Sequence, residues 1–193
     1  MATAVTSTSD AAEIPGPIPC AYPPAKPPAH VYDTIITIAV GPDNAKKKFK
    51  IYRGLLCHFS SYFDRMLNGS FKECGSTYLR LKDIDAETFN VFYYWLNSGV
   101  VDCMDNAAQF HWTKAMTVYV FADFHQASIF KNAVLDSLYR FWVAERQVRV
   151  GVTEFLYTNT SEGDGMRKLI VDILITTGGF RKCDKARLFN CHK

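Results

Sequence analysis

The sequence predicts an α+β fold in which a small, mostly antiparallel sheet packs against a cluster of helices. Three observations predict this class. Two segments within residues 33–52 alternate apolar and polar side chains, as half-buried strands do. Most of the chain after residue 85 repeats apolar side chains at helical spacing. The segments also follow an order that is typical of α+β domains: a strand pair, a helix pair, one short strand and then helix after helix.

The length and composition suit one domain with a tail at each end. The chain has 193 residues, of which 48% are hydrophobic, and this is enough for a packed core. Residues 1–30 are rich in Ala, Thr and Pro. Because proline fixes φ and lacks a backbone donor, we expect this N-terminal tail to be disordered. We place the folded domain at residues 31–145, a helical C-terminal extension at residues 146–180 and a basic tail at residues 181–193.

The sheet is expected to contain three strands. Residues 33–40 and 49–52 are the first two, and the turn-forming residues 41–44 between them indicate an antiparallel hairpin. Residues 78–81 form a third, shorter strand. The strand side chains that we expect to face the core are Ile36, Ile38, Val40, Leu79 and Leu81.

A pair of helices and then a longer helix are expected next. Residues 53–59 form the first helix, which Ser60 interrupts before the second begins. The longer helix is expected over residues 86–97, because Asp85 is a favourable N-cap and Gly99 is a typical C-terminal stop. The side chains of these helices that we expect to be buried are Phe63, Phe89, Val91, Phe92, Trp95 and Leu96.

Three further helices are expected in the C-terminal half of the chain. Two of them cover residues 107–124 and 127–143, where apolar residues recur three and four positions apart. The last begins at an Asp164 cap and ends near Gly178.

The most informative stretch is residues 49–63, which read Phe-Lys-Ile-Tyr-Arg-Gly-Leu-Leu-Cys-His-Phe-Ser-Ser-Tyr-Phe. It resembles the signature of the BTB/POZ family, Phe-x-x-His-Lys-x-x-Leu-x-x-x-Ser-x-x-Phe, with Tyr52 in place of His and Arg53 in place of Lys. Residues 79–89 look like the strand, Asp and Phe segment of the same family. Residues 95–99, Trp-Leu-Asn-Ser-Gly, stand where members carry a Tyr-Thr-Gly ending, with Asn in place of Tyr.

The resemblance covers residues 31–178, and it implies a BTB/POZ fold and a protein–protein interaction module, not an enzyme. The Trp-Leu helix ending is similar to that of stand-alone BTB proteins common in filamentous fungi. Two functions are implied: a substrate adaptor for a cullin-3 ubiquitin ligase, or a scaffold for transcriptional or signalling complexes without cullin binding. The third alternative is a stand-alone interaction domain whose partner is specific to its own lineage.

Phe71 and Glu73 are the partner-binding residues that the resemblance implies for the adaptor. They follow the second helix at the distance where cullin-binding BTB proteins carry a hydrophobic-x-Glu motif. In those proteins the apolar side chain fills a pocket on cullin-3 and the Glu makes a polar contact at the rim. The alternative is an ordinary surface loop in which Phe71 folds back on the domain.

Asp33 and Arg53 are the residues that the resemblance implies for the scaffold. In dimeric members linked to zinc fingers, matching residues form a charged pocket that recruits co-repressors. The alternative is a structural role, in which Asp33 and Arg53 pair with each other near the start of the domain.

The resemblance also bears on self-association, because long-form members exchange an extra N-terminal helix and strand between subunits. Here the matching residues 18–28 are rich in proline, which disfavours both a helix and a ladder strand. We therefore expect a monomer or a weak homodimer, closer to the Skp and elongin C branch.

Lys46, Lys47, Lys48 and Lys50 form a basic cluster in the predicted hairpin. It has the composition of a nuclear-import signal, but the interpretation we favour is a solvated hairpin tip whose lysines discourage edge-to-edge pairing. The net charge of +3 is too small to indicate nucleic-acid binding or attraction to a membrane surface.

Several other function classes are disfavoured. Residues 1–10 lack the features of a secretory signal, and no run approaches the ~18 apolar residues of a membrane helix. We therefore expect an intracellular protein, cytoplasmic, nuclear or both, whose six cysteines are free thiols. The sequence contains no catalytic motif and no cofactor fingerprint, and His111 and His125 are expected at the surface or as helix caps. The Cys183, Cys191 and His192 group lacks both the spacing and the fourth ligand of a zinc site, so we expect no metal.

Overall fold

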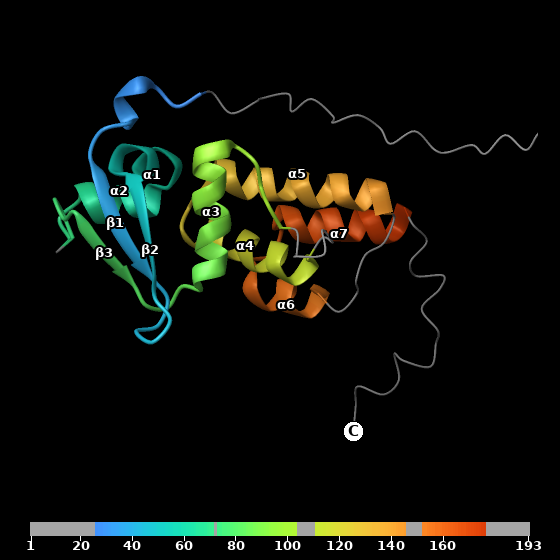
Figure 1. Cartoon of the computed structure of the whole chain (residues 1–193). Coiled ribbons are helices and arrows are strands. Elements are labelled where there is room, and N and C mark those ends of the chain that lie inside the picture. The colour runs from blue at the N-terminus through green and yellow to red at the C-terminus, as the bar shows by residue number, and fades with distance from the viewer. Residues whose placement is uncertain (1–25, 72, 104–110, 146–151, 177–193) are drawn as a thin grey trace, which may run out of the picture.

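The computed structural model describes residues 26–71, 73–103, 111–145 and 152–176. The elements in chain order are the 3-10 turn η1 (Ala29–Val31), β1 (Ile35–Val40), β2 (Lys47–Tyr52), α1 (Arg53–Phe59), α2 (Ser61–Asn68), β3 (Tyr78–Leu81), α3 (Ala86–Ser98), α4 (Trp112–Phe124), α5 (Ser128–Glu145), α6 (Val152–Asn159) and α7 (Gly165–Thr176). In Figure 1 the sheet lies at one end with α1 and α2 beside it, α3 stands in the middle, and α4 to α7 form the other end. The predicted α+β class is confirmed.

The sheet has the strand order β2-β1-β3. β1 pairs with β2 in antiparallel register, with Ile36 opposite Ile51, which confirms the predicted hairpin. β1 pairs with β3 in parallel register, with Ile38 opposite Leu79. The expectation of a mostly antiparallel sheet therefore holds for only one of the two strand pairs. The second pair is parallel because α1 and α2 cross over between β2 and β3 and return the chain in the direction of β1.

One face of the sheet is packed into the core. All five strand side chains that were predicted to point inward are buried, and Phe49 and Ile51 of β2 join them. The alternate residues of the same strands lie on the opposite face, where Ile35, Lys48 and Tyr78 are exposed. This alternation is what an antiparallel or mixed sheet with one covered face requires.

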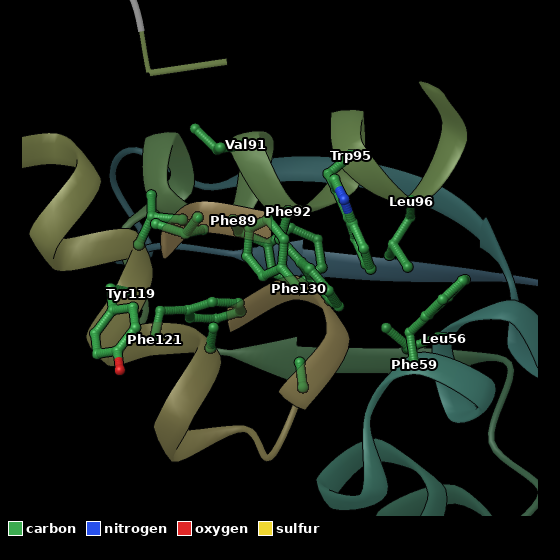
Figure 2. Close-up of a cluster of buried hydrophobic side chains, with 14 of the residues drawn as sticks. Leu56, Phe59, Phe89, Val91, Phe92, Trp95, Leu96, Tyr119, Phe121 and Phe130 are labelled. Atoms are coloured by element: carbon green, nitrogen blue, oxygen red, sulfur yellow. The ribbon is translucent and has the colours of Figure 1, made fainter. Parts of the chain in front are cut away.

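Aromatic rings dominate the core between α3, α4 and α5 (Figure 2). The ring centroids of Trp95 and Phe130 are 4.8 Å apart, and those of Phe92 and Phe130 are 4.9 Å apart. All six helix side chains that the sequence placed in the core are buried. α3 is buried on two sides, as predicted, because it lies between the sheet and the C-terminal helices.

The helix ends follow the capping residues of the sequence. The Asp85 carboxylate accepts the Thr88 N–H at 2.8 Å, and Gly99 ends α3 with φ of 75°. Ser60 ends α1 and caps α2, because its Oγ accepts the Phe63 N–H at 3.2 Å. The imidazole of His111 caps α4 by accepting the Lys114 N–H at 3.1 Å, so this histidine is a capping residue, as expected.

Two helix predictions need correction. The helix expected over residues 107–124 begins at Trp112, while residues 107–110 lie outside the described residues. The sequence did not predict α6, since of its side chains from residue 153 onward only Leu156 is buried and the apolar pattern is correspondingly weak. None of the helices in the described part of the chain is long and apolar enough to cross a membrane.

Candidate functional site

The loop that leaves α2 presents Phe71 to solvent. The Phe71 side chain is 62% exposed, so it does not fold back on the domain. Glu73, two residues further on, is partly exposed, and Lys72 between them lies outside the described residues. The loop thus displays an aromatic ring and a carboxylate in one short turn.

Backbone contacts hold this loop at both ends. The Cys74 N–H donates to the Phe71 carbonyl at 3.0 Å, and the Gly75 N–H donates back to the Leu67 carbonyl of α2 at 3.3 Å. Gly75 has φ of 74°, a left-handed conformation that glycine adopts without strain. A Cβ on Gly69 would lie 2.2 Å from the Arg65 carbonyl oxygen, so the chain can leave α2 this closely only with glycine there.

A pocket of about 570 Å³ lies between α2, α4 and the segment that joins β3 to α3. α2 contributes Tyr62 and Met66, and α4 contributes Phe121 and Phe124. The Phe124 side chain is 70% exposed, and its ring centroid lies 6.0 Å from that of Tyr62. The pocket therefore has an aromatic rim, and the helix that leads into the Phe71 loop lines one side of it.

His125 also lines this pocket, as a buried residue. Its side chain is only 3% exposed, and its ring centroid lies 4.1 Å from that of Phe121 and 4.9 Å from that of Tyr62. Burial lowers its pKa, so the imidazole is neutral near pH 7 and its Nδ1 donates to the Phe121 carbonyl at 2.8 Å. His125 is the C-cap of α4, as expected for a capping residue, but its side chain is buried and does not lie at the surface.

Asp33 and Arg53 form hydrogen bonds with different partners. The Asp33 carboxylate accepts the Gly54 N–H at 2.9 Å, at the start of α1. The Arg53 guanidinium donates to the Leu67 carbonyl and to the Asn68 side chain, both at 2.7 Å, and so joins α1 to the end of α2. Within the part of the chain that is described, no ion pair joins Asp33 to Arg53. The charged pocket that the resemblance implies therefore stays a prediction. Both residues have structural contacts, although not with each other as the structural alternative supposed.

A comparison with protein families identifies this arrangement. The model of the BTB/POZ domain matches residues 32–139, which is more than half of the chain. This protein belongs to the BTB/POZ family. No curated protein matches the chain. BTB domains are generally interaction modules, which directs attention to the exposed surfaces of this one.

The C-terminal extension packs on the BTB domain through buried apolar side chains, such as Leu156 and Met166, and through one buried carboxylate. Asp164 accepts a hydrogen bond from the Tyr119 hydroxyl of α4 and another from the Lys131 ammonium of α5, both at 2.8 Å. It also accepts the Met166 N–H at 2.9 Å and so caps α7, as the sequence predicted. Lys131 also donates to Asp123 of α4 at 2.7 Å. The bonds of Asp164 to Tyr119 and Lys131 therefore attach the extension to both helices of the α4–α5 hairpin.

The protonation states in this cluster follow from opposing effects. Burial alone would raise the pKa of Asp164, but hydrogen bonds from Lys131, Tyr119 and Met166 outweigh it and hold that pKa below its ordinary value. Burial likewise opposes the charge on Lys131, but its bonds to Asp123 and Asp164 raise its pKa. Burial, followed by the bond to Asp164, raises the pKa of Tyr119 to about 12. At neutral pH the charged Lys131 therefore pairs with two carboxylates, the buried one of Asp164 and the more exposed one of Asp123, and Tyr119 is neutral.

The cysteines in the described residues are free thiols. Burial raises the pKa of Cys57 to about 11 and that of Cys103 to about 12, so both are protonated and poor nucleophiles at neutral pH. Among the described residues no group of three His, Cys, Asp or Glu side chains could hold a metal ion. The Cys183, Cys191 and His192 group lies outside those residues.

The pocket and the docking cluster were not predicted from the sequence. Tyr62 and Phe124 lie on different helices that are far apart in the chain, and local periodicity cannot show that they meet. The only available signal was Phe124 itself, a large apolar residue at the end of a helix pattern whose buried positions were already filled.

Proposed function

We propose that this BTB domain is a non-catalytic adaptor that binds a cullin-3 ubiquitin ligase scaffold through Phe71 and Glu73. The observation that carries the proposal is the exposure of the Phe71 side chain, which is 62% accessible at the tip of an anchored loop. Exposure of a large apolar side chain to water is unfavourable, and burial of that side chain in a pocket of a partner would recover the free energy. An aromatic anchor with a charge beside it is also the usual composition of a small binding hot spot.

The pocket beside α2 adjoins the Phe71 loop and supports the proposal that a partner binds at this surface. Tyr62 and Met66 line it, and α2 then runs directly into the loop that carries Phe71. Exposed Phe124 adds a second apolar side chain on the pocket rim. A partner that covered both the loop and this rim would bury several aromatic side chains. The apolar contact would then be larger than one exposed residue alone could provide.

The experiment is a titration of the full chain with the N-terminal domain of cullin-3 by calorimetry. We expect submicromolar binding, stronger than about −8 kcal/mol, and loss of at least about tenfold in affinity in the Phe71→Ala, Glu73→Ala double variant. The matched control is Tyr94→Ala, which removes an aromatic side chain of α3 that is 48% exposed, and it should bind as the wild type does.

The alternative is a BTB scaffold for transcriptional or signalling complexes that does not bind cullin. The pocket rimmed by Tyr62 and Phe124 is equally compatible with this alternative, because it could receive a partner without Phe71. If neither the wild type nor the double variant binds cullin-3, the adaptor proposal fails and the scaffold remains. Substitutions at Tyr62 or Phe124 should then reduce the amount of partner protein recovered from cells with this chain. Substitutions at Asp33 or Arg53 should have the same effect if these residues form the charged pocket.

We further propose that the protein is an intracellular monomer or weak homodimer of the stand-alone fungal type. The free thiols of Cys57, Cys74 and Cys103 support a reducing compartment, cytoplasmic, nuclear or both. Light scattering at micromolar concentration tests the oligomeric state, and a stable dimer would contradict this part of the proposal.

A further inference from the structure

The open edge of the sheet at β2 carries an unpaired row of backbone groups. β2 is the outer strand of the order β2-β1-β3, at the edge of the sheet nearest α3 in Figure 1. The Arg53 N–H bonds to the Thr34 carbonyl at 2.8 Å, and this fixes which β2 residues face β1. Because ladder bonds alternate along an antiparallel strand, the amide and carbonyl groups of Phe49 and Ile51 point to β1. Those of Lys48 and Lys50 point outward, away from the sheet.

The side chains of Lys48 and Lys50 lie on the exposed face of the same edge. Both are exposed, and neither has an ion pair within the described part of the chain. Their cross-strand neighbours on this face are Ala39 and Thr37, which carry no charge. By contrast, Lys47 lies on the inner face and pairs with Glu87 of α3. The edge therefore presents two lysines without counter-charges beside two sets of free backbone groups.

The remaining charges of this face do not supply the missing counter-charge. Arg80 of β3 lies opposite Ala39 and pairs with Asp43 at 2.9 Å, and Lys82 lies 3.6 Å from the same carboxylate. Asp43 is thus already shared between two cations. The face as a whole has an excess of positive charge that is concentrated toward β2.

Apart from the Lys47–Glu87 ion pair at one end, the inner side of the edge is apolar. Phe49 is buried next to Tyr93 of α3, with ring centroids 5.3 Å apart, and Tyr93 is only partly buried. A strand added beside β2 would set alternate side chains next to Lys48 and Lys50, and the other side chains over Phe49 and Tyr93. Acidic residues suit the first positions and apolar residues suit the second.

We propose that the β2 edge is a second docking site, which receives an extended segment of a partner protein in which acidic and apolar residues alternate. The segment adds a fourth strand to the sheet, its backbone bonds to Lys48 and Lys50, and its carboxylates neutralise their ammonium groups. The same lysines exclude a second copy of this chain, since antiparallel pairing of two β2 edges would set lysine beside lysine. The site is independent of Phe71 and of the cullin proposal.

The test uses the full chain and a synthetic peptide of about eight residues that alternates Glu and Val, a typical strand length. We expect binding that weakens as salt rises from about 0.05 to 0.5 M, because the lysines are solvent-exposed. The Lys48→Glu, Lys50→Glu variant should lose at least about tenfold in affinity, since two attractive cross-strand pairs become repulsive. The Lys46→Glu, Lys168→Glu variant has the same net charge and should lose less than about threefold.

Two further measurements separate strand addition from mere attraction between charges. The amide protons of Lys48 and Lys50 should become protected from exchange when the peptide is added, as measured by NMR. N-methylation of one alternate set of peptide residues, either all Glu or all Val, should abolish binding, because only one set directs its N–H groups at β2. These changes are made on the peptide, so the fold of the protein is not at risk.

Three results would overturn the proposal. One is an affinity that the Lys48→Glu, Lys50→Glu variant leaves unchanged. Another is binding that is insensitive to both N-methylated peptides and leaves the two amides unprotected, which would show attraction without a new strand. The last is binding of single-stranded oligothymidylate through these lysines with none of the peptide, which would assign the face to nucleic acid.

Discussion

At the scale of single residues, the core positions could be predicted because burial follows local periodicity. The spacing of Phe89, Phe92 and Leu96 at i, i+3 and i+7 fixes one face of α3, and the structure buries all three. The burial of His125 could not be predicted in this way. Its burial depends on Tyr62 and Phe63, which come from a helix more than sixty residues earlier in the chain, and local spacing carries no trace of that contact.

Leu96→Ala tests the register of α3. The Leu96 side chain is 6% exposed, so its truncation removes apolar contacts and leaves a cavity. We expect the free energy of unfolding to fall by about 2–5 kcal/mol in urea denaturation. Asn90→Ala, at an exposed position of the same helix, should change it by less than about 0.5 kcal/mol. Equal effects of the two substitutions would contradict the register.

At the scale of elements, the ends of helices were more predictable than their partners. The sequence predicted that Ser60 separates two helices, because serine caps helices and the apolar pattern restarts after it. The second role of Ser60 was not predictable. Its buried hydroxyl donates to the His125 carbonyl at 2.6 Å and so ties the α1–α2 junction to the end of α4. α6 escaped prediction for a related reason, since its stability depends on packing against α4 and α7 more than on its own pattern.

Ser60→Ala tests this junction. The substitution removes the acceptor of the Phe63 N–H and the donor to the His125 carbonyl, and it leaves both groups without that partner in a buried site. We expect a loss of about 1–3 kcal/mol in the free energy of unfolding. Ser61→Ala, one residue further on and exposed, is the matched control and should be nearly neutral. A neutral Ser60→Ala would show that water or a shift of α2 replaces both bonds.

At the scale of the whole molecule, the sequence predicted that a helical extension follows the BTB domain, but not how it is attached. Asp164 was recognised only as a cap. Its partners Tyr119 and Lys131 come from two other helices, so one carboxylate both starts α7 and fixes α7 to the α4–α5 hairpin. The candidate binding surfaces could be predicted only in part for the same reason. Phe71 and Glu73 are close in sequence, whereas the pocket and the β2 edge depend on which strands and helices become neighbours.

The attachment of the extension through Asp164 should depend on pH, and comparison with Asp164→Asn measures this dependence. The pKa of Asp164 is lower in the folded protein than its ordinary value of about 3.9, because the charged form is bound by Lys131 and Tyr119. The folded state therefore gains stability from the carboxylate at every pH well above the unfolded pKa, and it loses this gain as pH falls through the lower folded pKa. Asparagine keeps an acceptor for the Tyr119 hydroxyl but no charge for Lys131. We expect Asp164→Asn to cost about 1–3 kcal/mol at pH 7.

The difference between wild type and Asp164→Asn should shrink as pH falls below the ordinary pKa of about 3.9, and it should keep shrinking until pH has passed through the lower pKa of Asp164 in the folded state. Urea denaturation of both proteins across this range measures it, and the subtraction removes the contributions of Asp43 and Asp85, whose pKa values are also lowered. Asp172→Asn, at an exposed position of α7, should show no such difference at any pH. A gap between wild type and Asp164→Asn that stays constant from pH 7 to pH 2 would mean that the charge of Asp164 does not hold the extension. The buried apolar side chains of α7, Met166, Ile170 and Ile173, would then account for its docking.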